Sequence, residues 1–174
     1  MAQQVLPVSE SWHRIDTWLA AHAPSSLARL NPPASQADIR DAERVLGIPL
    51  PGDLAESLRC HNGQHAQVSL LPEHVEPLPA SAIAEHWRMR MDIAAGVDGL
   101  IAAPWADEPW WHLLWIPWAE SAGGDAQVID QRPGPDAGRV GWAVHDDCGD
   151  FTDSWPSLAA LLHAFAQAPW ATGA

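Results

Sequence analysis

The spacing of apolar residues predicts helices in the first half of the chain. Between Trp12 and Leu19, apolar residues recur every three or four positions, which predicts a helix over about residues 9–22. Ser9 or Ser11 stands where the N-cap of such a helix is expected. The first predicted element is therefore a helix with one apolar face.

Three further helices are predicted by their start and stop signals. Ser35, with an aspartate three residues later, forms a capping-box pattern, and Gly47 ends the helix that it opens. The next helix follows Pro51-Gly52 and is closed by Asn62-Gly63. A longer helix is expected to begin with Ser81 as its cap.

Strand signals dominate from residue 110 onward. The segment 110–118 has apolar side chains on both faces when read with a period of two, which predicts a buried central strand. Pro117 should end or bulge this strand, because proline cannot donate to a ladder. Gly123-Gly124 supplies a turn into a second strand at Val128-Ile129, and residues 139–144 predict a third. Three strands in succession predict an antiparallel meander.

Weaker signals complete the predicted order of elements. Short strands are expected at residues 67–71 and 100–103. A turn is expected at residues 147–151, followed by a last helix with Ser154 as its cap and Pro156 in its first turn. The chain therefore reads as helices, a meander and a closing helix.

The charge balance narrows the classes of ligand. The chain has a formal net charge of -13 and no lysine, and residues 98–174 contain 11 acidic residues against only Arg132 and Arg139. A surface of this sign repels phosphate backbones and anionic lipid, and it attracts cations or a basic protein. The sequence therefore disfavours binding to nucleic acid or to a membrane.

Composition also bounds the size and class of the protein. With 174 residues, of which 47% are hydrophobic, the chain has enough apolar side chains for one core. Cys60 and Cys148 lie far apart and form no Cys-x-x-Cys pair, so no zinc site or disulfide framework is indicated. No run approaches 18 apolar residues, and the first residues lack the pattern of a signal peptide. We expect a cytoplasmic protein without a cofactor.

A set of landmarks in a fixed order resembles a known superfamily. The landmarks are Leu30, Pro32, Ile39, Glu43, Leu46-Gly47, Leu50-Pro51, Leu54 and Asn62-Gly63, then Trp115-Ile116-Pro117, Ala119, Gly123-Gly124, Asp130, Pro133-Gly134-Pro135 and Gly138-Arg139-Val140-Gly141, and last Asp153-Ser154-Trp155, Leu158, Leu161 and Leu162. Together they resemble the SUKH superfamily, which contains the fungal cell-wall-assembly regulator domain and many bacterial immunity proteins. One departure is that Glu120-Ser121 and Ala122 stand where an acidic pair and a third glycine often precede the loop.

The resemblance implies both a fold and a role. It implies an α+β fold in which N-terminal helices and a C-terminal helix pack on a mainly antiparallel central sheet. We therefore expect a single domain over residues 1–174, with its core at about 28–168. For bacterial members, the resemblance also implies an immunity protein that binds and neutralises a co-encoded toxin, often a nuclease or a deaminase.

The densest group of polar side chains is at residues 145–153, which contain His145 and four aspartates. Such oxygen ligands could hold a divalent cation or activate a water, as in a metal-dependent hydrolase. The spacing matches no calcium loop or zinc signature, so a solvated turn is favoured. Motifs for a serine or cysteine nucleophile or for a phosphate-binding loop are absent from the sequence. We therefore expect no catalytic residue and no metal site.

These observations favour a non-enzymatic binding protein whose acidic C-terminal half meets a basic protein, with a cognate toxin as the leading partner. Clustered carboxylates raise association rates, and large aromatic side chains serve as interface anchors. An alternative is a regulatory scaffold or adaptor that binds a cellular protein, and a metal-dependent hydrolase is less favoured. The predicted contact residues are Glu120, Asp125, Asp146, Asp147 and Asp150, with Trp105 and Trp110 as anchors.

Overall fold

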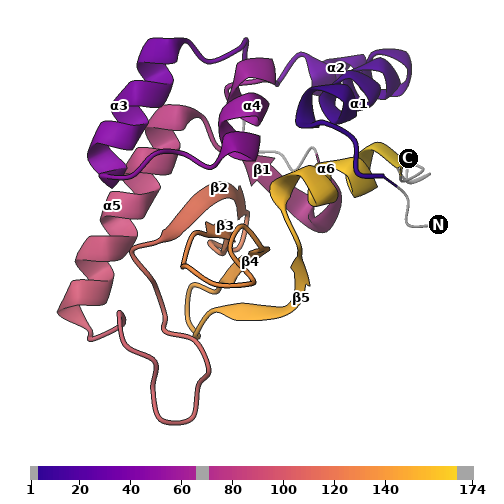
Figure 1. Ribbon diagram of the computed structural model, residues 1–174. Helices are drawn as coiled ribbons and strands as arrows, with labels where there is room; N and C mark the ends of the chain where they lie inside the picture. Colours follow the sequence, from indigo (N-terminus) through magenta and orange to yellow (C-terminus); the bar gives the residue numbers. More distant parts are fainter. Residues whose placement is uncertain (1–3, 66–70, 168–174) are drawn as a thin grey trace.

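The helices predicted from apolar spacing are present in the structure. The computed structural model describes residues 4–65 and 71–167 (Figure 1). Its helices are α1 (Val8–His22), α2 (Pro24–Leu27), α3 (Gln36–Leu46), α4 (Gly52–Cys60), α5 (Ala80–Gly96) and α6 (Leu158–Gln167), with a short 3-10 helix η1 (Pro72–His74). In Figure 1, α3 lies beside α5 on one side of the molecule, and α1 lies beside α6 on the other.

The predicted capping box of α3 is confirmed. The Ser35 Oγ accepts a hydrogen bond from the Asp38 N–H (3.1 Å), and the Asp38 carboxylate accepts one from the Ser35 N–H (2.8 Å). Gly47 ends the helix in the left-handed region, with φ of 73°. Local sequence therefore fixes both ends of this helix.

The predicted caps of α1 and α5 are wrong. These helices begin after Pro7 and Pro79, whose fixed φ suits the entry to a helix. Val8 and Ala80, the first residue of each helix, are buried in the core, so packing extends each helix beyond the expected start. The serines predicted as caps lie inside the helices: Ser9, Ser11 and Ser81.

An antiparallel sheet of five strands forms the second half of the fold among the described residues. The strands are β1 (Val75–Pro77), β2 (Trp115–Ser121), β3 (Ala126–Asp130), β4 (Val140–Ala143) and β5 (Asp150–Trp155). They lie side by side in chain order, each paired antiparallel to the next. The α+β class and the predicted meander are confirmed, and the meander has one additional strand on each side.

The tryptophan-rich strand is shorter than predicted. It begins at Trp115, whereas residues 110–114 and the strand expected at 100–103 belong to a loop, residues 97–114, that joins α5 to β2. Trp111 of this loop is buried by packing over the sheet rather than by pairing with it, which sequence alternation does not distinguish, whereas Ile101, Trp105 and Leu113 are exposed. The strand expected at residues 67–71 falls mostly outside the described residues.

The turn predicted at residues 147–151 is present as far as Gly149, in the connection from β4 to β5, but the cap predicted for α6 is wrong. Residues 150–155 form strand β5, whose side chains are mostly exposed and polar, so they read as a loop in the sequence. Ser154 therefore lies in a strand. The residue that caps α6 is Ser157, whose Oγ accepts a hydrogen bond from the Ala160 N–H (3.1 Å).

Both faces of the sheet are buried, as predicted for the central strand. One face, with Ile116 and Trp118, packs against the helices. The other face, with Trp115, is covered by Trp111 of the loop and by Ala94 of α5. Register shifts just after Pro117, which confirms the predicted bulge. The loop at residues 97–114 extends away from the helices at the bottom of Figure 1.

Candidate protein-binding surface

One end of the sheet holds all five acidic residues that the sequence analysis selected. Because the strands are antiparallel, the ends of β2 and β4 meet the starts of β1, β3 and β5. Glu120 is the next-to-last residue of β2, Asp125 precedes β3, and Asp150 begins β5. Asp146 and Asp147 lie in the connection from β4 to β5. We call this set of five residues the acidic end.

Three of the seven selected residues line one open cleft of about 570 Å³. Trp105, which is 87% exposed, lies in its wall with Asp147 and Asp150. Phe151 and Arg139 also line the cleft. A hydrogen bond from the Thr152 N–H to the Asp150 carboxylate (2.9 Å) lowers the pKa of Asp150, which keeps it ionised. The Trp105 cleft therefore combines an accessible aromatic ring with the ionised carboxylate of Asp150.

A second group surrounds His145. Asp125 Oδ1 accepts hydrogen bonds from the N–H and from Nδ1 of His145, both at 2.9 Å. Burial raises the pKa of Asp125, but these hydrogen bonds outweigh burial, and the pKa lies below its usual value. Asp146 Oδ2 is 3.7 Å from His145 Nε2. Trp110 is half-buried, and its Nε1 donates to the His145 carbonyl oxygen (3.0 Å), which ties the loop to this end of the sheet.

Glu120 lies apart from both groups, next to strand β1. It is the cross-strand neighbour of Glu76, and burial raises the pKa of Glu120. His86 Nδ1 lies 3.8 Å from Glu120 Oε2. The structure therefore divides the acidic end into the Trp105 cleft, the His145 group and the Glu76–Glu120 pair.

A buried arginine connects helix α5 to this end of the sheet. Arg90 of α5 donates to the Gly124 carbonyl oxygen (2.6 Å) in the turn between β2 and β3. Its guanidinium lies over the rings of Trp110 and Trp111, at 4.9 and 5.6 Å from their centroids. Arg90 thus links α5, the loop and the turn that precedes Asp125.

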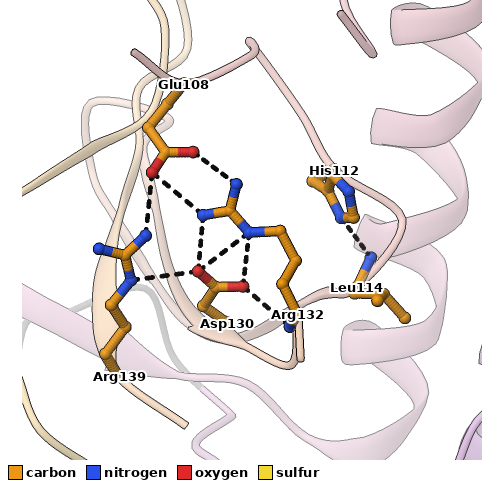
Figure 2. Close-up of polar contacts among 6 residues, drawn as sticks. All are labelled: Glu108, His112, Leu114, Asp130, Arg132 and Arg139. Atoms are coloured by element: carbon orange, nitrogen blue, oxygen red, sulfur yellow. Dashed lines mark hydrogen bonds and ion pairs between the residues drawn. The ribbon is translucent and has the colours of Figure 1, made fainter. Parts of the chain in front are cut away.

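Sequence reasoning missed a charged network, two members of which, Glu108 and Arg139, line the Trp105 cleft. Figure 2 shows the contacts of the network. Arg132 bonds Glu108 (2.7 Å) and Asp130 (2.6 Å), and Arg139 bonds the same two carboxylates (2.9 and 3.1 Å). Asp130 is 2% exposed. Burial raises its pKa, but the hydrogen bonds from Arg132 outweigh this and lower it overall.

The network also packs on aromatic rings. The Arg132 guanidinium lies 5.4 Å from the Trp115 ring, and that of Arg139 lies 4.1 Å from Phe151. Near it, the Leu114 N–H donates to His112 Nδ1 (3.0 Å), as Figure 2 shows. Asp130 lies two residues before Arg132 in the sequence, and this spacing is the signal from which their ion pair could have been predicted. Glu108 could not be assigned, because it comes from the distant loop.

The network changes the charge of the surface. Arg132 and Arg139 are the two arginines in residues 98–174, and both are matched by Glu108 and Asp130. Of the 11 acidic residues in that segment, 11 minus two leaves nine without an arginine from the same segment. The exposed members therefore keep a net negative field.

The remaining candidate features are a metal site, the two cysteines and a membrane-spanning helix. Within residues 4–65 and 71–167, no three His, Cys, Asp or Glu side chains cluster in a way that could hold a metal ion. Cys60 and Cys148 are half-buried free thiols. None of the described helices combines the length and apolarity needed to cross a membrane.

Comparison with known proteins gives a consistent set of relatives. The model of the SMI1 / KNR4 family (SUKH-1) matches residues 33–164. The chain is 33% identical over 156 residues to the "Cell wall biosynthesis/cell cycle regulator smi1" of Schizosaccharomyces pombe, covering 79% of this chain and 31% of that protein. It is 40% identical over 60 residues to a "KNR4/SMI1 homolog" of Kluyveromyces lactis, covering 34% and 11%. It is 37% identical over 54 residues to the "Cell wall assembly regulator SMI1" of Saccharomyces cerevisiae, covering 31% and 11%.

Proposed function

The chain belongs to the SMI1/KNR4 family (SUKH-1), and from this premise we propose that it is a non-enzymatic domain whose acidic end binds a basic protein. The predicted resemblance to the SUKH superfamily is confirmed. The names of its relatives support a regulatory or protein-binding role. The contact surface is our own inference from the described side chains.

One observation carries the proposal: both arginines of residues 98–174 form ion pairs within the chain. Glu108 and Asp130 bind Arg132 and Arg139, so the charges of these arginines are matched by two other carboxylates and not by Asp147 or Asp150 of the Trp105 cleft. A concentrated negative field speeds encounter with a basic partner, and an exposed aromatic ring slows its release. Such binding needs no catalytic group in this chain.

The leading partner is a cognate basic toxin, for which the chain would act as an immunity protein. A nuclease presents a cationic path for its substrate, and an acidic surface can cover that path by charge complementarity. One inhibitor per toxin suffices for neutralisation. The aspartates of the Trp105 cleft, Asp147 and Asp150, are the proposed contacts, with Trp105 as anchor.

A second candidate is a regulatory adaptor, favoured by the names of the relatives. The three that we describe are called regulators or homologues of regulators. The chain spans less than a third of the length of each. A regulatory role would use the same acidic end toward a cellular protein instead of a toxin.

Co-expression separates the two candidates. We expect the chain to restore growth of cells that produce the toxin encoded beside it, and the Asp147→Asn/Asp150→Asn variant to restore less. The matched control is Asp41→Asn/Glu85→Gln, which removes the same charge from a separate hollow between α3 and α5. If no neighbouring product is toxic and the captured partner is a cellular protein, the adaptor role holds. If the cleft variant binds that partner as well as the control does, the proposed surface is wrong.

A further inference from the structure

A small cavity beside β1 has a composition that differs from the Trp105 cleft. It measures about 230 Å³ and lies between the end of the α4 connection, strand β1 and the start of α5. Two carboxylates, Glu76 and Glu120, line it together with His65. The remaining wall includes Leu78, Pro79 and Ala82, so it is largely apolar.

The two carboxylates face each other across neighbouring strands, and among the described residues no cation is paired with Glu76. Glu76 and Glu120 are direct partners across β1 and β2, an arrangement that destabilises a sheet when both are charged. Glu76 is only 7% exposed, and no hydrogen bond from a described residue reaches its carboxylate. Burial and the nearby Glu120 both raise the pKa of Glu76. A buried carboxylate left in this state lacks the positive group that would normally accompany it.

A buried histidine is aimed at the same pair. The His86 side chain is 9% exposed, and its Nδ1 has no hydrogen-bond partner among the described residues. Its Nε2 must accept from Arg90 Nε (3.3 Å), because arginine only donates, so the proton of the neutral ring lies on Nδ1. That N–H points toward Glu120, 3.8 Å away, which is too far for a hydrogen bond. The His86 Nδ1–H and the Glu120 carboxylate therefore lie near each other without a hydrogen bond between them.

Among residues 4–65 and 71–167, none places a cation against Glu76. The chain has no lysine, and no arginine lines the cavity. The charge of Arg90 acts on Glu120 and opposes the rise in its pKa. The Arg90 guanidinium, however, already donates hydrogen bonds to the Gly124 carbonyl oxygen and to His86 Nε2. A metal ion is disfavoured, since the described residues contain no group of three suitable ligands.

We propose that this cavity receives the guanidinium group of an arginine side chain from the protein partner. This inference rests on the proposed function and names the chemistry at one point of the interface. A planar guanidinium has five donors on separate edges and can bond two carboxylates at once, whereas an ammonium is a point charge. Its methylene stem would pack on Leu78, Pro79 and Ala82.

The test uses a small probe in place of the partner. The full chain is titrated with methylguanidinium while backbone amide signals are followed by NMR, with methylammonium and potassium chloride as comparisons. We expect saturable shifts at Glu76, Glu120 and His65, with methylguanidinium binding roughly tenfold tighter than methylammonium. Shifts no larger than those in potassium chloride, or equal binding of the two cations, would overturn the proposal.

Three variants make the test specific. Glu76→Gln should weaken the binding of methylguanidinium by roughly tenfold or more, and it should raise the Tm because it removes the like-charge pair. Glu120→Gln gives an independent loss of binding, and Glu85→Gln, on an exposed position of α5 outside this cavity, should leave binding unchanged. Full binding by both Glu76→Gln and Glu120→Gln would contradict the assignment. Partner capture through the Trp105 cleft is measured separately, so failure here does not imply failure of the proposed function.

Discussion

Asp130 shows how one residue can organise a surface without being part of it. It is buried, yet four donor groups from Arg132 and Arg139 keep it ionised. A buried ion pair adds little net stability compared with apolar residues, but removing one partner leaves an uncompensated charge. Asp130 therefore acts chiefly, together with Glu108, to hold two arginines in place and to match their charges.

Asp130→Asn should destabilise the fold by about 3 kcal/mol, because Arg132 and Arg139 would lose a buried counter-charge. Denaturant unfolding followed by tryptophan fluorescence measures this. Asp136→Asn is the control, since Asp136 is exposed in the loop between β3 and β4. Equal effects of the two substitutions would show that the network does not hold the fold.

Trp105 contributes little to the core but is the proposed anchor of the interface. Because its side chain is 87% exposed, Trp105→Ala should leave the Tm unchanged. The affinity of the Trp105→Ala variant for the partner should fall by roughly 2 kcal/mol of binding free energy, the size typical of an interface anchor. Calorimetry with the purified partner measures the change, and Ile101→Ala is the control, since Ile101 is 75% exposed in the same loop. An unchanged affinity would remove Trp105 from the interface.

Sequence reasoning could select Trp105 but could not distinguish its environment from that of its neighbours. Trp105, Trp110 and Trp111 occur within seven positions, yet they are exposed, half-buried and buried in turn. Their burial depends on how the loop folds over the sheet, and that path has no local signal. The Glu108 contacts were unpredictable for the same reason.

At the scale of elements, local signals predicted those parts that local interactions determine. The capping box of α3, the bulge after Pro117 and the Gly123-Gly124 turn depend on near neighbours, and all three are present. Strands β1 and β5 were missed because one has three residues and the other is mostly polar and exposed. Edge strands of this kind owe their pairing to the adjacent strand rather than to their own pattern.

A histidine joins α1 to the end of α4 and makes stability depend on pH. His61 Nε2 contacts the Asp16 carboxylate at 3.0 Å. Burial lowers the pKa of His61, but the hydrogen bond and charge of Asp16 outweigh burial, and the pKa is raised. The stabilisation is therefore complete below the unfolded value of about 6.5 and is lost as the pH rises through the folded pKa.

Asp16→Asn should remove this part of the pH dependence. The Tm of the native chain should decline as the pH rises from about 6.5, and the variant should decline less over the same range. Thermal unfolding across that range measures the difference. Asp41→Asn, which breaks an exposed ion pair with Arg44, should keep the native profile. A native slope retained in Asp16→Asn would contradict the role of this pair.

His86 makes stability depend on pH in the opposite sense, so the contributions of His61 and His86 can be measured separately. Burial, and then the charge of Arg90, lowers the pKa of His86 to about 4. The neutral ring therefore stabilises the fold above about pH 6.5, and this contribution is lost as the pH falls toward the folded pKa. Loss of stability on the alkaline side can be assigned to His61, and His86 contributes on the acidic side.

At the scale of the whole molecule, the selected carboxylates lie apart from most of the helices. Most helices pack on the face of the sheet that contains Ile116 and Trp118, whereas these carboxylates lie at one end of its strands and around the Trp105 cleft. Net charge predicted the sign of the surface, because -13 is large for 174 residues. The placement could not be predicted, since it follows from the antiparallel order of strands far apart in the sequence.

The affinity of the purified partner for the chain, measured at about 0.05 M and about 0.3 M salt, tests most directly whether the acidic end binds by charge. We expect the native affinity to fall by roughly tenfold or more at the higher salt, mainly through slower association. Asp147→Asn/Asp150→Asn should bind more weakly at low salt and lose less on adding salt, whereas Asp41→Asn/Glu85→Gln should follow the native chain. An affinity indifferent to salt, or a cleft variant with the native salt dependence, would contradict binding through this surface.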